Sequence, residues 1–167
     1  GAQVFVNAFL NGNTSRWDVA AKTATPVTRF GQVEDWMLVG DTVHAGTYPT
    51  GNLVSVPEAA TATTPLTTYT SLKDSHAQIR PIDVQEHGGR IWYGTNPDYG
   101  QHGGAIAIVD PATKAVDVTR NVVAEHTIAA LAFLGEDLYA GSSTIGGTGT
   151  EPVAGSGGVL IPPVGYL

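Results

Sequence analysis

The chain contains no cysteine, which excludes disulfide bonds and metal sites built on thiolates. Lysine occurs only at Lys22, Lys73 and Lys114, and the net charge is −7. Because no basic stripe is available to replace the counterions of a phosphate backbone, nucleic acid is excluded as a partner, and an anionic membrane surface is excluded for the same reason. No apolar run approaches the roughly 18 residues that a membrane-spanning helix needs.

Turn-forming and strand-forming residues are abundant instead. The 167 residues include 21 glycines and 10 prolines, 42% are hydrophobic and only 14% are charged. This balance, with many threonines and valines, predicts an all-β protein of many short strands. The lack of cysteine and the shortage of lysine also suit a protein exported by a bacterium, so we expect a secreted, extracellular location.

One phrase recurs along the chain. It reads GDTVHAGT at 40–47, GGRIWYGT at 88–95 and GEDLYAGS at 135–142, with spacings of 48 and 47 residues, and GAQVFVNA at 1–8 fits the same frame. Self-similarity at a period in the forties is typical of folds assembled from repeated small sheets. Each phrase predicts a glycine turn between two strands of a hairpin.

Residues alternate after each turn. His44 falls in the same column as Phe5, Trp92 and Tyr139, and both faces of these strands are largely apolar, so we expect sheets stacked face to face with His44 packed between two of them. Outer strands are expected at 52–56, 104–110 and 158–161, and another within 59–72. The segment 122–135 fits a helix closed by a glycine, but its register with the other repeats favours a strand.

The repeats resemble the blades of a known family. The phrase VDPATK at 109–114 and the tyrosine–glycine phrases at 93–95 and 139–142 are similar to those of bacterial β-propellers of the YVTN and PQQ-like type. The resemblance covers essentially the whole chain and implies an incomplete propeller, with half a blade and about three four-stranded blades. The implied divisions are a remnant at 1–28 and blades at about 29–72, 73–120 and 121–167. Because propellers close with more blades, the expected partner is the remaining blades or another chain.

Loops that follow the repeated phrases are expected to meet at one end of such a fold. They comprise 48–52, 96–104 and 143–158, and the segments around Glu34 and Arg80 should reach the same end. The candidate ligand-binding residues there are Asp35, Tyr48, Arg80, Asp83, Asp98, Tyr99 and His102. The simpler interpretation is that Asp35 and Asp83, which occupy equivalent repeat positions, hold turns in place while the tyrosines pack on loops.

Two functions from different classes fit this set. The first is a non-catalytic binding module that takes an extracellular ligand, such as a carbohydrate, or a partner chain at the loop end. The alternative is a secreted lyase acting on acidic polysaccharide, in which Arg80 neutralises a uronate and a tyrosine or histidine moves the protons. A purely structural piece of an assembly is a third. The histidine spacings do not match a metal site, so neither metal nor cofactor is expected.

Overall fold

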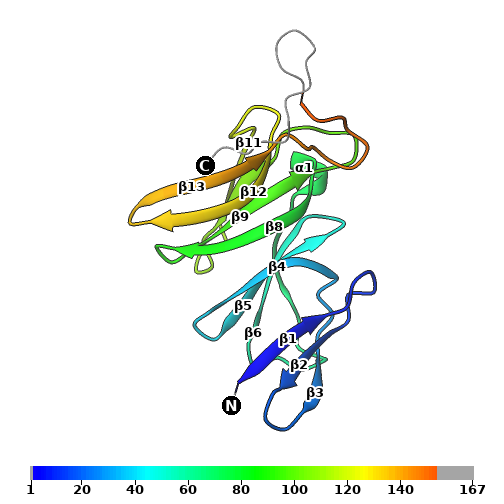
Figure 1. Ribbon diagram of the computed structural model, residues 1–167. Helices are drawn as coiled ribbons and strands as arrows, with labels where there is room; N and C mark the ends of the chain where they lie inside the picture. The colour runs from blue at the N-terminus through cyan, green and yellow to red at the C-terminus, as the bar shows by residue number, and fades with distance from the viewer. Residues whose placement is uncertain (1, 154–167) are drawn as a thin grey trace.

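The computed structural model describes residues 2–153, which form four antiparallel sheets and one short helix. The sheets follow one another in chain order through the molecule, from the amino-terminal sheet at the bottom of Figure 1 to the last sheet near the top. The fold is therefore all-β, as the composition predicts. No closed ring is present among the described residues.

The strands pair in sequence order within each sheet. The first sheet contains β1 (Gln3–Asn7), β2 (Thr14–Asp18) and β3 (Thr23–Val27), and the second contains β4 (Gln32–Val39), β5 (Thr42–Tyr48), β6 (Asn52–Pro57) and β7 (Thr67–Ser71). Helix α1 (Lys73–His76) precedes the third sheet, which contains β8 (Gln78–His87), β9 (Arg90–Pro97), β10 (Ala105–Val109) and β11 (Val116–Arg120). The fourth sheet contains β12 (Thr127–Leu134) and β13 (Asp137–Ser143).

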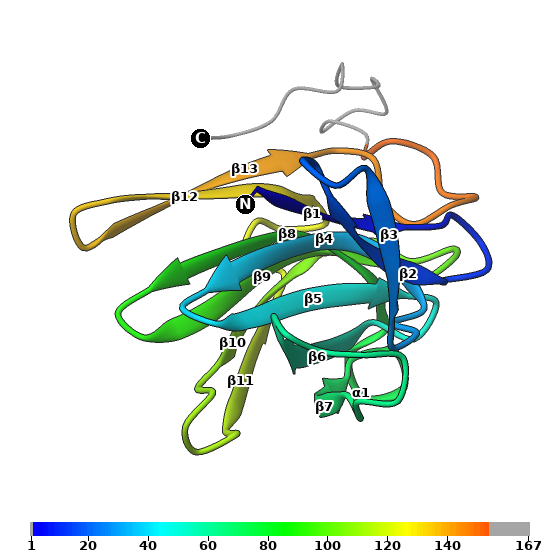
Figure 2. The same cartoon turned by 90° about the horizontal axis from the view of Figure 1, so that it is seen from below.

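The first strands of the second, third and fourth sheets lie together. Strand β8 contacts both β4 and β12, and in the view from below these three strands run side by side while the later strands of the second and third sheets extend away from them (Figure 2). In the described part of the chain, no helix is long and apolar enough to span a membrane.

The first glycine of each repeat makes the predicted hairpin turn. Gly40, Gly88 and Gly135 have φ of 60°, 61° and 62°, the left-handed region that side chains with a Cβ rarely adopt. Each begins a two-residue loop that joins two paired strands. The repeated sequence phrase therefore corresponds to a repeated backbone conformation at the hairpin turn.

The second glycine of the first two repeats, Gly46 and Gly94, allows close packing. A Cβ at Gly46 would overlap the Cβ of Pro81 in β8 and lie 2.7 Å from its carbonyl oxygen, and one at Gly94 would lie 3.1 Å from the carbonyl oxygen of Ile128 in β12. Both contacts join a second strand to the first strand of the next sheet. These glycines are therefore required by the approach of successive sheets.

Three core clusters fill the spaces between the sheets. His44, 3% exposed, lies on the face of β5 opposite Val43 and Ala45, and it stacks on Tyr69 with ring centroids 6.1 Å apart. Trp92 packs against the fourth sheet. His44 is buried, and the ring on which it stacks, Tyr69 in β7, belongs to its own sheet.

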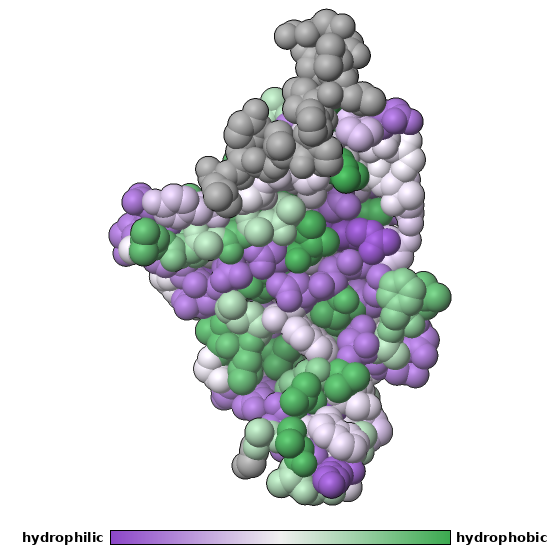
Figure 3. All heavy atoms as spheres, viewed as in Figure 1, coloured by the Kyte–Doolittle hydropathy of each residue, from purple (hydrophilic) through white to green (hydrophobic). Residues whose placement is uncertain are grey.

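Among residues 2–153, apolar side chains of the first and last sheets are exposed on the outer faces of these sheets. Val4 and Val6 of β1 are 49% and 52% exposed, and Tyr139 of β13 is 45% exposed. Apolar surface also appears in Figure 3 over the lower part of the molecule, where β1 to β5 lie.

The strands expected at 52–56 and 104–110 are β6 and β10, two further strand predictions are confirmed, and one strand count is corrected. Segment 122–135 contains strand β12, not a helix, and 59–72 contains β7. The amino-terminal sheet has three strands and not the half of a four-stranded unit that was expected, because β2 and β3 form a hairpin beyond β1. The fourth sheet has two strands among the described residues, and the strand expected at 158–161 lies outside them.

Candidate functional site

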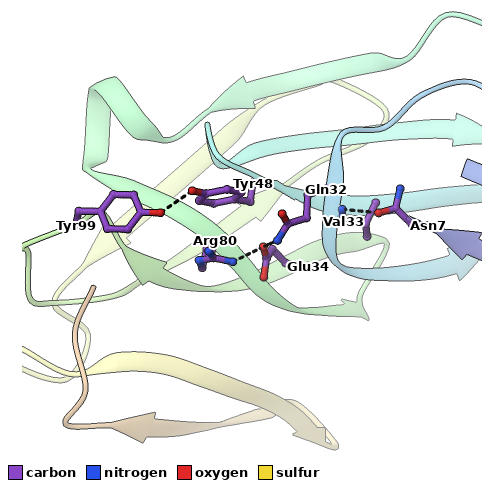
Figure 4. Close-up of polar contacts among 7 residues, drawn as sticks. All are labelled: Asn7, Gln32, Val33, Glu34, Tyr48, Arg80 and Tyr99. Carbon is purple, nitrogen blue, oxygen red and sulfur yellow. Dashed lines mark hydrogen bonds and ion pairs between the residues drawn. The ribbon is translucent and has the colours of Figure 1, made fainter. Parts of the chain in front are cut away.

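A cluster of aromatic and charged side chains lies at the loop end of the second and third sheets. The hydroxyl oxygens of Tyr48 and Tyr99 are 2.5 Å apart, and the guanidinium carbon of Arg80 lies 4.0 Å from the centre of the Tyr48 ring. Figure 4 shows the three side chains converging from different segments of the chain. The structure therefore brings together three of the seven candidate residues, which we call the tyrosine–arginine cluster.

Local structure explains how these side chains meet. Tyr48 is the last residue of β5, and the Tyr48–Pro49 peptide bond is cis. Tyr99 lies in the loop after β9, where the Asp98 carboxylate accepts a hydrogen bond of 2.8 Å from the Tyr99 N–H. Arg80 stands in β8 between two register irregularities. Irregularities of this kind change the direction of side chains at the ends of strands.

The positive charge of Arg80 has a partner within the protein. Its Nη1 lies 2.6 Å from Glu34 Oε1, and the amide nitrogen of Gln32 donates a hydrogen bond of 2.8 Å to the same oxygen. Glu34 sits at the bulge between Val33 and Asp35. Because Glu34 already compensates the guanidinium, a ligand carboxylate would have to compete with it for Arg80.

Tyr48 is poorly suited to act as a base at neutral pH. Its hydrogen bond with Tyr99 is the main cause that raises the pKa of Tyr48, and the charge of Arg80 opposes this rise only in part. Tyr48 therefore presents a neutral hydroxyl group at neutral pH. Such groups donate and accept hydrogen bonds, and the phenol rings supply apolar faces.

Asp35 and Asp83 connect sheets. Asp35 Oδ2 accepts a hydrogen bond of 2.8 Å from the N–H of Val84 in the third sheet, and Asp83 accepts one from the N–H of Leu131 in the fourth. These two contacts are equivalent in the repeat frame, and both carboxylates use them to hold the next sheet. Burial, assisted by the nearby Asp83, raises the pKa of Asp35.

Asp98 and His102 lie in the same loop but engage other groups. The carboxylate of Asp98 holds the Tyr99 N–H, and the carbonyl of His102 accepts a hydrogen bond of 3.1 Å from Arg120 Nη2. This loop also meets the one after β13, since Gly147 N–H donates to the Gln101 carbonyl at 2.9 Å. The expectation that these loops share one end agrees with these contacts, although neither side chain joins the tyrosine–arginine cluster.

Sequence reasoning named Glu34 at this end but left it, and Gln32, out of the site. Gln32 occupies the repeat position of Arg80, 48 residues earlier, which was a usable signal. The polar contacts that link Arg80 to Glu34 and Gln32 extend to the first sheet. There, Asn7 Oδ1 accepts a hydrogen bond of 3.1 Å from Val33 N–H (Figure 4). In residues 2–153, no group of three or more His, Cys, Asp or Glu residues could hold a metal ion.

No family model matches this chain. A comparison with curated proteins found no match either. The geometry of the described residues is therefore the basis for a functional proposal.

Proposed function

We propose that this chain is part of a β-propeller and serves as an extracellular, non-catalytic binding module. Its loop end, centred on Tyr48, Arg80 and Tyr99, takes a carbohydrate. Four sheets in chain order support the propeller, together with bulges at one equivalent position in the second, third and fourth sheets. The remaining blades, or another chain, complete the ring.

The observation that carries the binding proposal is the exposure and composition of the cluster. Tyr99 is 49% exposed although its hydroxyl is fixed by Tyr48. A fixed ring loses little conformational freedom on binding, and tyrosine and arginine dominate the energetic centres of many recognition surfaces. The apolar face of such a ring matches the C–H face of a sugar, and the neighbouring Glu34 and tyrosine hydroxyls match its hydroxyl groups.

The same cluster offers little support for a lyase. Abstraction of a proton by tyrosine is helped by a lowered pKa, whereas the pKa of Tyr48 is raised. Neutralisation of a uronate needs an available cation, whereas Arg80 is paired with Glu34. We therefore retain only the binding proposal.

A binding assay with Tyr99→Ala tests the proposal. We expect the wild-type protein to bind a member of a panel of neutral and acidic polysaccharides, and loss of the ring to weaken that binding by about tenfold, the usual effect of removing a central aromatic residue. Affinity electrophoresis or calorimetry would measure the change.

Tyr139→Ala is the matched control, because Tyr139 is a similarly exposed tyrosine on the last sheet. It should leave carbohydrate binding unchanged. Equal loss in both variants, or no binding to any member of the panel, would contradict the proposal. Release of unsaturated products from an acidic polysaccharide, seen as ultraviolet absorbance, would favour the lyase instead.

A further inference from the structure

Two phenol rings meet through their hydroxyl groups at the loop end of the second and third sheets. The hydroxyl oxygens of Tyr48 and Tyr99 are 2.5 Å apart, although the two residues are separated by 51 positions in the chain. Figure 4 shows each hydroxyl directed at the other. When two tyrosines couple by oxidation, the bond forms between the ring carbons next to the hydroxyls, and the hydroxyls lie side by side in the product. The contact therefore brings the reactive parts of both rings together.

Backbone hydrogen bonds hold Tyr99 from both sides. The Asp98 N–H donates to the Ala77 carbonyl at 2.7 Å, and the Gly100 N–H donates to the Thr148 carbonyl at 3.1 Å. The side chain of Tyr99 is 49% exposed, so its ring has room to turn until an edge of it meets an edge of the partner ring. Two groups held near each other in this way react faster than the same groups on separate molecules.

Solvent access favours this pair over other tyrosines of the described chain. Tyr48 is partly exposed and Tyr99 is half-exposed. By contrast, Tyr93 is 0% exposed, and the Tyr69 hydroxyl bonds to Ser55 Oγ at 2.8 Å. An oxidant in solution therefore reaches both members of the Tyr48–Tyr99 pair.

Few other side chains of this protein would compete for an oxidant. The chain has no cysteine, and its single methionine, Met37, is partly buried against a core cluster. Exposed cysteine and methionine are oxidised readily, and a cysteine thiol could also repair a tyrosyl radical. Their scarcity leaves aromatic side chains as the principal targets.

We propose that Tyr48 and Tyr99 form a site of oxidative cross-linking. Hydrogen peroxide and a peroxidase join the rings by a carbon–carbon bond, and the resulting dityrosine ties the second sheet to the loop of the third. The modification uses two residues of the proposed carbohydrate site, but it does not require that a carbohydrate bind there.

The reaction removes two electrons and two protons from the protein. The peroxidase takes one electron from each phenol, and each phenol releases its hydroxyl proton to water. Arg80, 4.0 Å from the centre of the Tyr48 ring, disfavours a positive charge on that ring, so the proton leaves with the electron and the radical is neutral. The two radicals form the new bond, and the hydrogen on each coupled carbon moves to its own oxygen. Hydrogen peroxide takes up the two electrons and two protons and becomes two molecules of water.

Treatment of dilute protein with hydrogen peroxide and a haem peroxidase tests the proposal. We expect a single chain that has lost the mass of two hydrogen atoms and shows the blue fluorescence of dityrosine. Trypsin should release residues 30–73 and 91–114 as one joined peptide, because each segment lies between two basic residues at which trypsin cleaves. Fragmentation of this peptide in the mass spectrometer should place the bond at Tyr48 and Tyr99.

Four conservative variants separate this pair from the other tyrosines. Tyr48→Phe and Tyr99→Phe keep the rings but remove the hydroxyls, and each should lower the yield of the joined peptide at least about tenfold, because the reacting pair is lost. Tyr69→Phe is the control within the same tryptic peptide as Tyr48. Tyr139→Phe is the control for exposure, since Tyr139 is 45% exposed. Neither control should change the yield.

A mixture of isotopically labelled and unlabelled chains distinguishes a bond within one chain from a bond between chains. Every joined peptide should be wholly labelled or wholly unlabelled. Joined peptides with one labelled and one unlabelled segment as the main product would overturn the proposal. Absence of the joined peptide from the oxidised wild type, or an equal yield in Tyr48→Phe, would also overturn it.

Urea unfolding of the oxidised protein tests whether the bond ties the sheets. We expect the cross-linked wild type to unfold at a higher urea concentration than the untreated protein, because a bond across 51 positions restricts the unfolded chain. Peroxidase-treated Tyr48→Phe should unfold at the same concentration as its untreated form. An unchanged midpoint in the cross-linked wild type would contradict the role as a tie between sheets.

Discussion

The Asp35 carboxylate makes a hydrogen bond between two sheets, but its negative charge is disfavoured by burial. Its carboxylate holds the Val84 N–H across two sheets, yet burial and the neighbouring Asp83 raise its pKa above the ordinary value of 3.8. The folded protein therefore binds this proton more tightly than the unfolded chain does. It follows that the contribution of Asp35 to the free energy of unfolding decreases as pH rises from 3.8 through the raised pKa.

Asp35→Asn separates the two effects. The amide oxygen can still accept the Val84 N–H, while the charge is gone, so we expect the dependence of the free energy of unfolding on pH above about pH 4 to become flatter. Asp35→Ala should instead lower the free energy of unfolding by about 1–3 kcal/mol, because the N–H of buried Val84 loses its partner. Urea unfolding at several pH values measures both, and an unchanged slope in Asp35→Asn would contradict the explanation.

The roles of these aspartates were only partly visible in the sequence. The repeat frame showed that Asp35 and Asp83 are equivalent and suggested a structural role for both. It could not show which groups they hold, because Val84 and Leu131 offer their N–H groups next to a bulge, and a bulge has no residue signature. The pairing of Glu34 with Arg80 could not be predicted either, because both residues also lie next to irregularities in strand register.

At the scale of the element, the repeated strands carry two kinds of glycine. Gly40, Gly88 and Gly135 serve the turns, and this role was predictable because hairpin loops have a known residue preference. The role of Gly46 and Gly94 was not predictable, since it depends on how closely the next sheet approaches. Packing distances between sheets are not encoded by local propensity.

Gly46→Ala tests this second role. The new methyl group would overlap Pro81, so we expect the free energy of unfolding to fall by about 1–3 kcal/mol, as is usual for overpacking. Gly141→Ala is the control, because a Cβ there would lie 3.4 Å from the nearest atom, the Cβ of Ala130 in the same sheet. Chemical denaturation compares the two, and equal midpoints would contradict the role assigned to Gly46.

At the scale of the whole molecule, the sequence repeat predicts the number and order of the sheets. It does not predict whether the sheets close into a ring. The sequence predicted stacked sheets with both faces buried, and the second and third sheets match this. The first and last sheets expose Val4, Val6 and Tyr139 on their outer faces. A period in the sequence identifies the unit, but whether the units close into a ring depends on small rotations between them.

Exposed outer faces predict association. We expect light scattering of this chain to give a mass above 17.3 kDa that depends on concentration, because contiguous apolar patches favour contact with another surface. Val6→Lys or Tyr139→Lys should reduce the mass toward that of a monomer. Phe9→Lys, which removes an even more exposed apolar residue from a loop, should not. A compact monomer of the wild-type chain at every concentration would contradict the prediction.

The similar contacts that join the second sheet to the third and the third to the fourth have a consequence for how such a protein can grow. In both cases a carboxylate reaches a backbone N–H of the next sheet, and a glycine makes room for that sheet's first strand. Duplication of about 48 residues would therefore add a unit that already fits its neighbours on both sides. Proteins built from this unit could therefore gain or lose copies of it without the need for a new interface between sheets.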